Sequence, residues 1–297
     1  MITKENRGSG TVDILKQNLR ERPQDVAQIL LERAIGKNTQ RLAILKRGED
    51  MYVVTPESIS VQLWFAGDFE PEVTNTLEAI LKKGMVFWNI GSHIGTRVVQ
   101  ADALVGRTGS ILAFEPTPRT KKLLDANSAN RIAQIQTFPY AVGNQTGSAA
   151  FRDYGWLASG LNTAAQTSRF HPRAWKREPK YEEITVQIIS VDELMRSTWL
   201  NGPDVLAIDA EGFELQIFEG AQTTLSTFKP VVVFETGDLG DSNTQGCLDN
   251  LCQLGYQFFE YRDGGLKVHI RQESYPEPGN LVAIHPQTQR SIIIKAS

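Results

Sequence analysis

The chain has 297 residues, of which 41% are hydrophobic and 22% are charged. This is the composition of a folded globular protein, and it excludes a disordered or fibrous chain. The formal net charge of -3 provides no overall attraction for nucleic acid. A chain of this length accommodates one α/β domain and an additional segment.

The cysteines and the hydrophobic runs indicate the cellular context. Only two cysteines, Cys247 and Cys252, are present, and no spacing of thiols and histidines predicts a metal site of the zinc type. The first residues are polar, and no run approaches the roughly 20 apolar residues that a membrane span requires. We therefore expect a cytoplasmic protein that binds neither a membrane nor nucleic acid. The sequence is compatible with a homo-oligomer.

Residues 1–83 predict an N-terminal extension made of helices and a β-hairpin. Apolar residues recur at helical spacing over 12–35, and Pro23 separates two helices there. The rest of the extension predicts a hairpin of strands 42–45 and 51–54, a further strand at 61–65 and a helix over 71–83. Gly84 is expected to end that last helix.

Residues 84–297 form the second predicted domain, in which short apolar runs alternate with amphipathic segments. This alternation is typical of an α/β fold with a doubly wound, mostly parallel, Rossmann-like sheet. Core strands are predicted at 85–90, 110–114, 135–138, 205–209 and 231–234, and helices at 95–105, 118–130, 190–198 and 212–228. Further strands are expected at 148–152 and 184–189, and an antiparallel pair at 256–261 and 281–285 closes one edge of the sheet.

The turn after the first core strand is the first candidate binding site. Ligands of open α/β sheets bind at the carboxyl ends of the strands. Gly91 allows a sharp turn close to a ligand, and Gly95 allows the next helix to pack against the strand. Glu115 ends the second strand, where a carboxylate can accept hydrogen bonds from both hydroxyls of a ribose. Together these residues indicate an adenosine-containing ligand, although turn glycines and a solvated strand end would give the same pattern.

His93 separates two classes of adenosine ligand. A pyrophosphate needs a glycine at this position of the turn, because the backbone must come very close to it. The histidine side chain therefore argues against NAD or FAD. S-adenosylmethionine (SAM) carries no phosphate and tolerates a wider turn.

Three segments resemble motifs of the FkbM-type methyltransferases, in the order that this family has them. They are residues 84–95 (GMVFWNIGSHIG), 113–116 (AFEP) and 207–214 (AIDAEGFE). Weaker likeness at 67–71, 140–144 and 231–235 extends the resemblance over residues 61–235. The chain departs from the family at Asn89, where an aspartate is usual, and at Ala207, where a lysine is common. Asn89 supplies no negative charge for the ammonium group of SAM.

The resemblance implies a class I methyltransferase fold with a seven-stranded sheet, SAM as methyl donor and O-methylation of a sugar or secondary metabolite. Carried over to this sequence, the cofactor-binding residues are Asn89, Ile90, Gly91, Ser92, His93, Ile94, Gly95, Glu115, Pro116, Ala141, Val142 and Asp209.

Three acidic residues are candidates for the catalytic base. Methyl transfer to a hydroxyl is an in-line displacement, which a base assists by taking the proton from the acceptor oxygen. Asp209, Glu211 and Glu235 lie near the ends of adjacent predicted strands. The same carboxylates can hold Mg²⁺, but acidic residues are too common to support a metal site. Glu211 can equally serve to stabilise a helix N-terminus.

Residues 154–180 are the candidate segment for recognition of a small-molecule acceptor. This segment combines aromatic, polar and basic side chains, which suit a glycosylated or anionic acceptor. The candidate contacts are Tyr154, Trp156, Asn162, Arg169, Arg173, Trp175 and Arg177. Residues 159–163 within it are expected to line the pocket or to form a hinge, and a solvated lid without substrate contacts is the alternative.

Three other functions stay open at this point. A methyltransferase that acts on protein fits the same motifs. A SAM-binding protein without catalysis is suggested by Asn89. A nicotinamide-dependent oxidoreductase is disfavoured by His93, for the reason given above.

Overall fold

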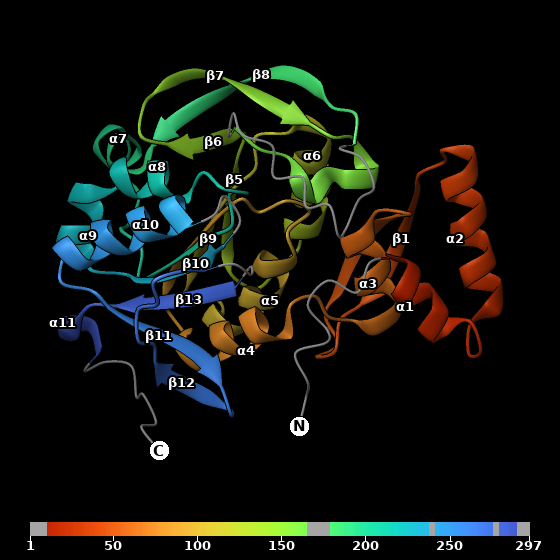
Figure 1. The fold of residues 1–297 in the computed structure, drawn as a ribbon, viewed down its shortest axis with the longest axis horizontal. Helices are drawn as coiled ribbons and strands as arrows, with labels where there is room; N and C mark the ends of the chain where they lie inside the picture. Colours follow the sequence, from red (N-terminus) through yellow and green to blue (C-terminus); the bar gives the residue numbers. More distant parts are fainter. Residues whose placement is uncertain (1–10, 165–178, 238–240, 276–278, 290–297) are drawn as a thin grey trace.

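A central sheet with helices on both faces makes up most of the molecule (Figure 1). The computed structural model describes residues 11–164, 179–237, 241–275 and 279–289. Four of the predicted acceptor contacts, Arg169, Arg173, Trp175 and Arg177, lie outside these ranges.

The main sheet has eight strands in the order β12-β11-β13-β10-β9-β3-β4-β5. Neighbouring strands from β5 to β10 are parallel, and β13, β11 and β12 run antiparallel to their partners. The bounds are β3 (Val86–Ile90), β4 (Ser110–Phe114), β5 (Gln134–Phe138), β9 (Val205–Ile208), β10 (Val231–Thr236), β11 (Gln257–Arg262), β12 (Gly265–Val268) and β13 (Gly279–Ile284). The predicted α/β fold with a mostly parallel sheet is confirmed.

The strand β12 is an eighth strand that the sequence analysis did not predict. Asp263 and Gly264 both have positive φ angles, of 52° and 78°. Two consecutive residues of this kind form the tight turn that favours a β-hairpin. The chain therefore folds back along β11 at this turn, before it continues to β13.

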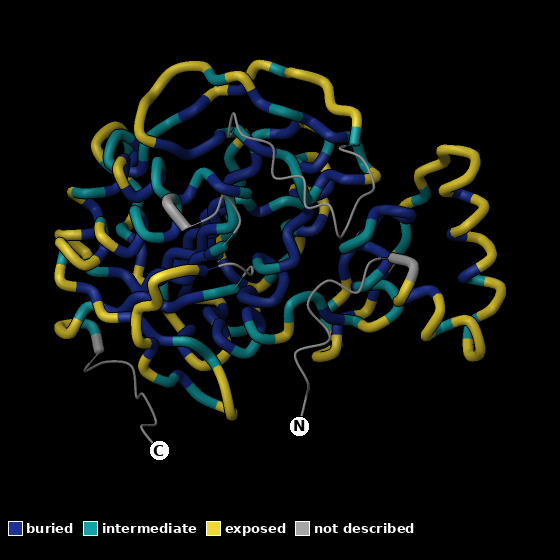
Figure 2. Tube along the Cα trace, viewed as in Figure 1, coloured by how far each residue is buried: buried dark blue, intermediate teal, exposed yellow. Residues whose placement is uncertain are grey.

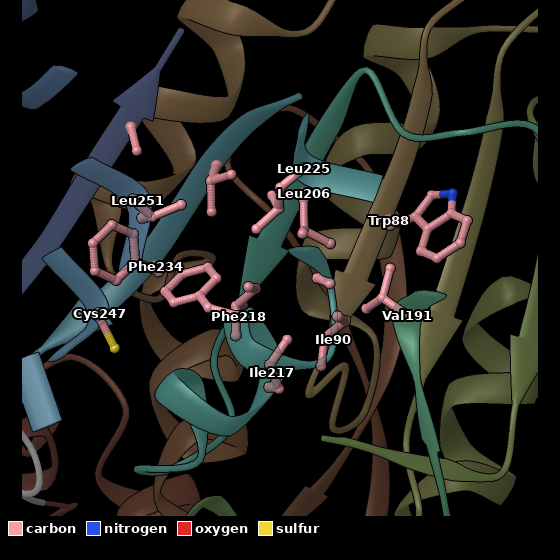
Figure 3. Packing of buried hydrophobic residues seen from close by; sticks show 14 of the residues in the cluster. Trp88, Ile90, Val191, Leu206, Ile217, Phe218, Leu225, Phe234, Cys247 and Leu251 are labelled. Carbon is pink, nitrogen blue, oxygen red and sulfur yellow. The ribbon is translucent and has the colours of Figure 1, made fainter. Parts of the chain in front are cut away.

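Alternate residues of the core strands point to opposite faces of the sheet and build two apolar layers. Trp88, Leu206 and Phe234 pack with the helices on one face (Figure 3), and Phe87 and Val205 pack with those on the other. The first set of helices is α7 (Val191–Ser197), α8 (Glu214–Glu219), α9 (Gln222–Phe228) and α10 (Asp241–Gln253), and the second is α4 (Pro71–Ile80), α5 (Thr96–Val105) and α6 (Pro118–Ser128). Strands that are buried on both faces are expected for a parallel sheet.

A second sheet and a short helix lie above the carboxyl ends of the main strands. The sheet has the order β6-β8-β7, with bounds β6 (Tyr140–Gly143), β7 (Gly147–Asp153) and β8 (Glu182–Ser190). The 3-10 helix η2 (Trp156–Leu161) follows β7. Ser190 caps α7 by accepting a hydrogen bond from the Glu193 amide.

The N-terminal helices and hairpin form a projection at one side of the molecule, with an exposed outer helix (Figure 2). They are α1 (Thr11–Asn18), α2 (Pro23–Ile35), β1 (Thr39–Ile44), β2 (Asp50–Thr55) and α3 (Ser58–Ala66). The two predicted helices and the predicted hairpin are confirmed. The final short helix of the described chain is α11 (Pro286–Gln289). None of the described helices has the length and apolar character that crossing a membrane requires.

The predicted strand at 61–65 is wrong, because this segment belongs to the helix α3. The buried Glu57 carboxylate accepts hydrogen bonds from the Ile59 and Ser60 amides, at 2.9 and 2.6 Å. This side chain satisfies two amides of the first helical turn, which have no partner inside a helix. Gly67, with φ of 67°, ends the helix. Capping at both ends therefore decides the conformation of a short apolar run.

Two predicted helices are shorter than expected. The helix α4 ends at Ile80, because Leu81 adopts an extended conformation and is buried beneath the sheet. The expected helix over 212–228 is broken into α8 and α9 at Gly220, where a Cβ atom would lie 2.0 Å from the Gly143 carbonyl oxygen. The division of the chain at residue 83 remains a prediction.

Candidate active site

An open cleft lies at the carboxyl ends of β3, β4 and β9. Eight of the predicted cofactor residues line it, namely Ile90, Gly91, His93, Glu115, Pro116, Ala141, Val142 and Asp209. The other four, Asn89, Ser92, Ile94 and Gly95, lie at the end of β3 and in the turn to α5, and they do not line the cleft. This is the edge of the sheet at which the sequence analysis expected a ligand.

The turn from β3 to α5 is held tightly against its neighbours. The Gly91 and Ser92 amides both donate to the Phe114 carbonyl, at 3.1 and 2.9 Å. Gly91 has φ of 79°, and a Cβ atom there would lie only 1.7 Å from the Asp209 carbonyl oxygen. The glycine is therefore required by the end of β9, in addition to any approach of a ligand. Ser92 Oγ donates to the Asn89 carbonyl at 2.8 Å and closes the turn.

Asn89 is buried behind this turn, with a side chain that is 1% exposed. Its Oδ1 atom has no hydrogen-bond partner among the described residues. A buried amide oxygen without a partner is unfavourable. The position at which the FkbM-type pattern has an aspartate therefore carries a neutral, buried side chain.

Glu115 is fixed at the cleft wall by three hydrogen bonds. Its Oε1 accepts from the Thr117 amide and the Thr120 hydroxyl, at 2.9 and 2.6 Å, and its Oε2 accepts from the His93 amide at 3.0 Å. Burial raises the pKa of the Glu115 carboxyl above its usual value, while the bonds from Thr120 and Thr117 act in the opposite direction. The carboxylate is thus oriented before any ligand binds.

His93 lines the cleft as a neutral side chain. Burial, together with a smaller contribution from the positive charge of Arg119, lowers the pKa of its imidazole to about 4. Its Nε2 lies 2.7 Å from Ser159 Oγ. Its backbone has φ of 48°, a conformation that residues other than glycine adopt rarely. The contact with Ser159 joins the turn between β3 and α5 to the segment that follows β7.

Asp209, Glu211 and Glu235 converge as the sequence predicts. One carboxylate oxygen from each lies within 4.8 Å of the others. Asp209 follows β9, Glu235 lies in the adjacent parallel strand β10, and Glu211 is turned toward them by a backbone with φ of 55°. Asp209 and Glu211 line the cleft. Carboxylates this close favour sharing a proton or a cation, so one of them is suited to act as a base.

Glu214 supports this turn without lining the cleft. Its Oε1 accepts hydrogen bonds from the Ala210 and Gly212 amides, at 3.0 and 3.1 Å. The carboxylate therefore fixes the backbone between Asp209 and α8.

The predicted acceptor contacts that the structure describes lie in different places. Asn162 lines the cleft. The Tyr154 ring packs against Tyr181 with ring centroids 5.4 Å apart, and Arg119 lies over the Trp156 ring at 5.2 Å. Neither of these aromatic residues lines the cleft.

Other residues of the cleft wall were not singled out from the sequence. They are Ile59, Phe114, Tyr140, Phe151, Ser159, Gly160, Ala164, Ala210 and Phe213, of which only Ser159 and Gly160 lay in a segment expected to line the pocket. The apolar members look like ordinary core residues in the sequence. Only the packing of α3 and the second sheet against the cleft reveals their position.

A doubly wound, mostly parallel sheet with a cleft at its carboxyl edge is the Rossmann-like architecture. The model of the FkbM methyltransferase domain matches residues 89–258, and the chain belongs to this family. The family that the sequence motifs indicate is therefore confirmed.

The chain is similar to the hexuronic acid methyltransferase AglP of Haloferax volcanii, with 25% identity over 174 residues. The match covers 58% of this chain and 65% of the relative, just under two thirds of its length. Solved structures with a distant likeness include the FkbM methyltransferase of Methylobacillus flagellatus KT, at 14% identity and a TM-score of 0.43, covering 76% of this chain and 52% of that one. Another is the SAM-bound fibrillarin of Aeropyrum pernix, at 12% identity and a TM-score of 0.41, covering 82% and 93%.

We expect Gly91→Ala to destabilise the protein more than Gly84→Ala. Both glycines have similar positive φ angles, but a Cβ atom at Gly84 would approach only Thr108 Oγ1, at 3.6 Å. The left-handed conformation alone costs about 1–2 kcal/mol for alanine. The collision with the Asp209 carbonyl should add about 1–3 kcal/mol to the loss in Gly91→Ala. Urea denaturation of both variants measures the difference, and equal losses would contradict the close approach.

We expect His93→Gln to flatten the dependence of stability on pH between about 6.5 and 4. In this window the unfolded chain binds a proton at His93 and the folded protein does not, so the wild type loses stability as the pH falls. Glutamine does not titrate, and the other groups contribute equally to both proteins. The difference between the two free energies of unfolding, measured at several pH values, isolates His93. Parallel curves would show that His93 is not held neutral.

Proposed function

We propose that the protein is a SAM-dependent methyltransferase that transfers a methyl group to a hydroxyl of a sugar or similar small molecule. The observation that carries the proposal is the Glu115 carboxylate, fixed at the cleft wall beside the glycine turn of an FkbM-family domain. A ribose fits this position, because a carboxylate can accept hydrogen bonds from two neighbouring hydroxyls.

The residues present suit SAM in three respects. Glu115 would hold the ribose, and Pro116, Ala141 and Val142 supply apolar wall on the adenine side. Gly91 lines the cleft at the turn, where the methionine part of SAM would lie. SAM supplies an electrophilic methyl group on a positively charged sulfur. The side chain of His93 occupies the position that a pyrophosphate would need, which disfavours a nicotinamide cofactor.

The chain itself would orient the acceptor and receive its proton. Asp209, Glu211 and Glu235 are our candidates for the base, because their carboxylates gather at one end of the cleft. The attacking oxygen must lie in line with the breaking carbon–sulfur bond, so the walls contribute mainly by alignment. A sugar acceptor is supported by the similarity to AglP, whose name states that it methylates hexuronic acid. Our proposal includes no metal ion.

The proposal places the reaction in the cytoplasm and away from nucleic acid. Cys247 and Cys252 are both free thiols, as expected in a reducing compartment. The net charge of -3 offers no general attraction to a polyanion.

Calorimetry with SAM and NAD, followed by transfer of a labelled methyl group, tests the function. We expect binding of SAM and not of NAD, and label in members of a panel of neutral hexosides and hexuronosides. Asp209→Asn, Glu211→Gln and Glu235→Gln should each weaken SAM binding less than they lower turnover, and the variant that lacks the base should lose at least about 100-fold in kcat at saturating SAM. SAM binding without transfer to any sugar or protein acceptor would indicate a binding protein, and no SAM binding would overturn the proposal.

We expect Glu115→Gln to weaken SAM binding by about 10- to 100-fold, because a charge-assisted bidentate contact contributes about 1.5–3 kcal/mol. Glu32→Gln is the matched control. Glu32 is also a fully buried carboxylate, held by Thr55 and Arg41 in the N-terminal extension, away from the cleft. The control should lose stability and keep its affinity for SAM. Unchanged affinity in a folded Glu115→Gln protein would remove Glu115 from the site.

A further inference from the structure

After β7 the chain crosses the cleft in residues 154–164, which we call the roof and which contain η2. Its first attachment is Ser159, a residue only 2% exposed, whose Oγ lies 2.7 Å from His93 Nε2. The His93 amide in turn donates to Glu115 Oε2 at 3.0 Å. One chain of hydrogen bonds therefore runs from the roof through the cofactor turn to the acid at the end of β4.

Asn162 makes the second attachment, to the turn after β4. Its Oδ1 accepts a hydrogen bond from the Tyr154 amide at 2.9 Å, which closes the roof on itself. Its Nδ2 donates to Thr117 Oγ1 at 3.3 Å. Because the Thr117 amide donates to Glu115 at 2.9 Å, this attachment also ends at a residue that is hydrogen-bonded to the same carboxylate.

Thr163 makes the third attachment, to the turn after β9. Its Oγ1 donates to the Glu211 carbonyl at 2.9 Å, and its backbone pairs with Arg152 at the end of β7. Glu211 belongs to the acidic cluster at the other end of the cleft. The roof therefore spans from the cofactor turn to the candidate base.

The N-terminal extension supports the roof from outside. Ile59 of α3 lines the cleft together with Gly160. A Cβ atom at Gly160 would lie 3.0 Å from Ile59 Cδ1, so the two residues are in close contact. The first part of the chain thereby contributes a wall to a site whose other walls come from the main and second sheets.

We propose that residues 154–164 cover bound SAM, and that Ser159 is a positioning residue that keeps the cofactor turn in register with Glu115 by holding the His93 ring. This inference rests on the proposed function. A neutral imidazole has one donor and one acceptor nitrogen, so the bond to Ser159 fixes which way the ring faces. Without the Ser159 hydroxyl, the ring and its turn lose that restraint, while Glu115 itself is unchanged.

Ser159→Ala tests this role against a matched control. We expect the Kd and KM for SAM to rise about 5- to 10-fold, the effect of one lost hydrogen bond, with little change in kcat at saturating SAM. Thr224→Val removes a hydroxyl bond of the same length, 2.7 Å, between α9 and Asp192, away from the cleft. It should lower stability and leave the Kd for SAM unchanged. Ser159→Thr keeps the hydroxyl and should restore most of the affinity.

Hydrogen exchange of the wild-type protein provides a second test that needs no variant. Amides of residues 156–163 should exchange more slowly when S-adenosylhomocysteine is bound, because the ligand lies beneath them. If the wild type binds SAM, unchanged exchange together with equal affinity in Ser159→Ala would overturn the role of the roof and leave the proposed function intact. If the wild type binds no SAM, the proposed function itself fails.

Discussion

The close approach of the β3 turn to the end of β9 determines the geometry of the cleft. Residue 91 can pass the Asp209 carbonyl only because it lacks a side chain. This contact places the turn after β3 beside Asp209, the first member of the acidic cluster. The same turn donates two amides to the Phe114 carbonyl, which directly precedes Glu115. The ends of three strands are therefore fixed relative to one another by backbone contacts, before any side chain meets a ligand.

Hydrogen bonds between polar side chains and the backbone connect these fixed strand ends further. Glu115 takes its hydrogen bonds from residues of two turns, and His93 passes the connection on to Ser159. Each buried polar group in this set has a partner, which keeps the cost of burial low. Behind the turn, by contrast, the amide oxygen of Asn89 has no partner among the described residues. A water molecule or a ligand atom that reaches this oxygen would remove the penalty.

Local sequence patterns were sufficient to place the core strands and eight of the residues that line the cleft. Apolar runs that end in glycine or an acid mark the carboxyl edge of a parallel sheet, so Gly91, Glu115 and Asp209 could be placed from the sequence. The helix α3 could not be predicted, because its short apolar run is equally compatible with a strand. Only the cap formed by Glu57 decides between helix and strand. Ile59 was missed for the same reason. The roof depends on contacts between residues far apart in the chain, such as His93 with Ser159, which no local pattern contains.

The charges along the cleft also bear on turnover under the proposed function. Among the described residues that line it, Glu115, Asp209 and Glu211 are acidic, His93 is held neutral, and none is lysine or arginine. Such a wall attracts a sulfonium ion more strongly than a thioether, because the interaction scales with the charge of the ligand. Methyl transfer converts the sulfonium ion into the thioether, so the electrostatic attraction between the cofactor and the acidic wall decreases during the reaction. The walls that favour binding of the donor thereby also favour release of the spent cofactor.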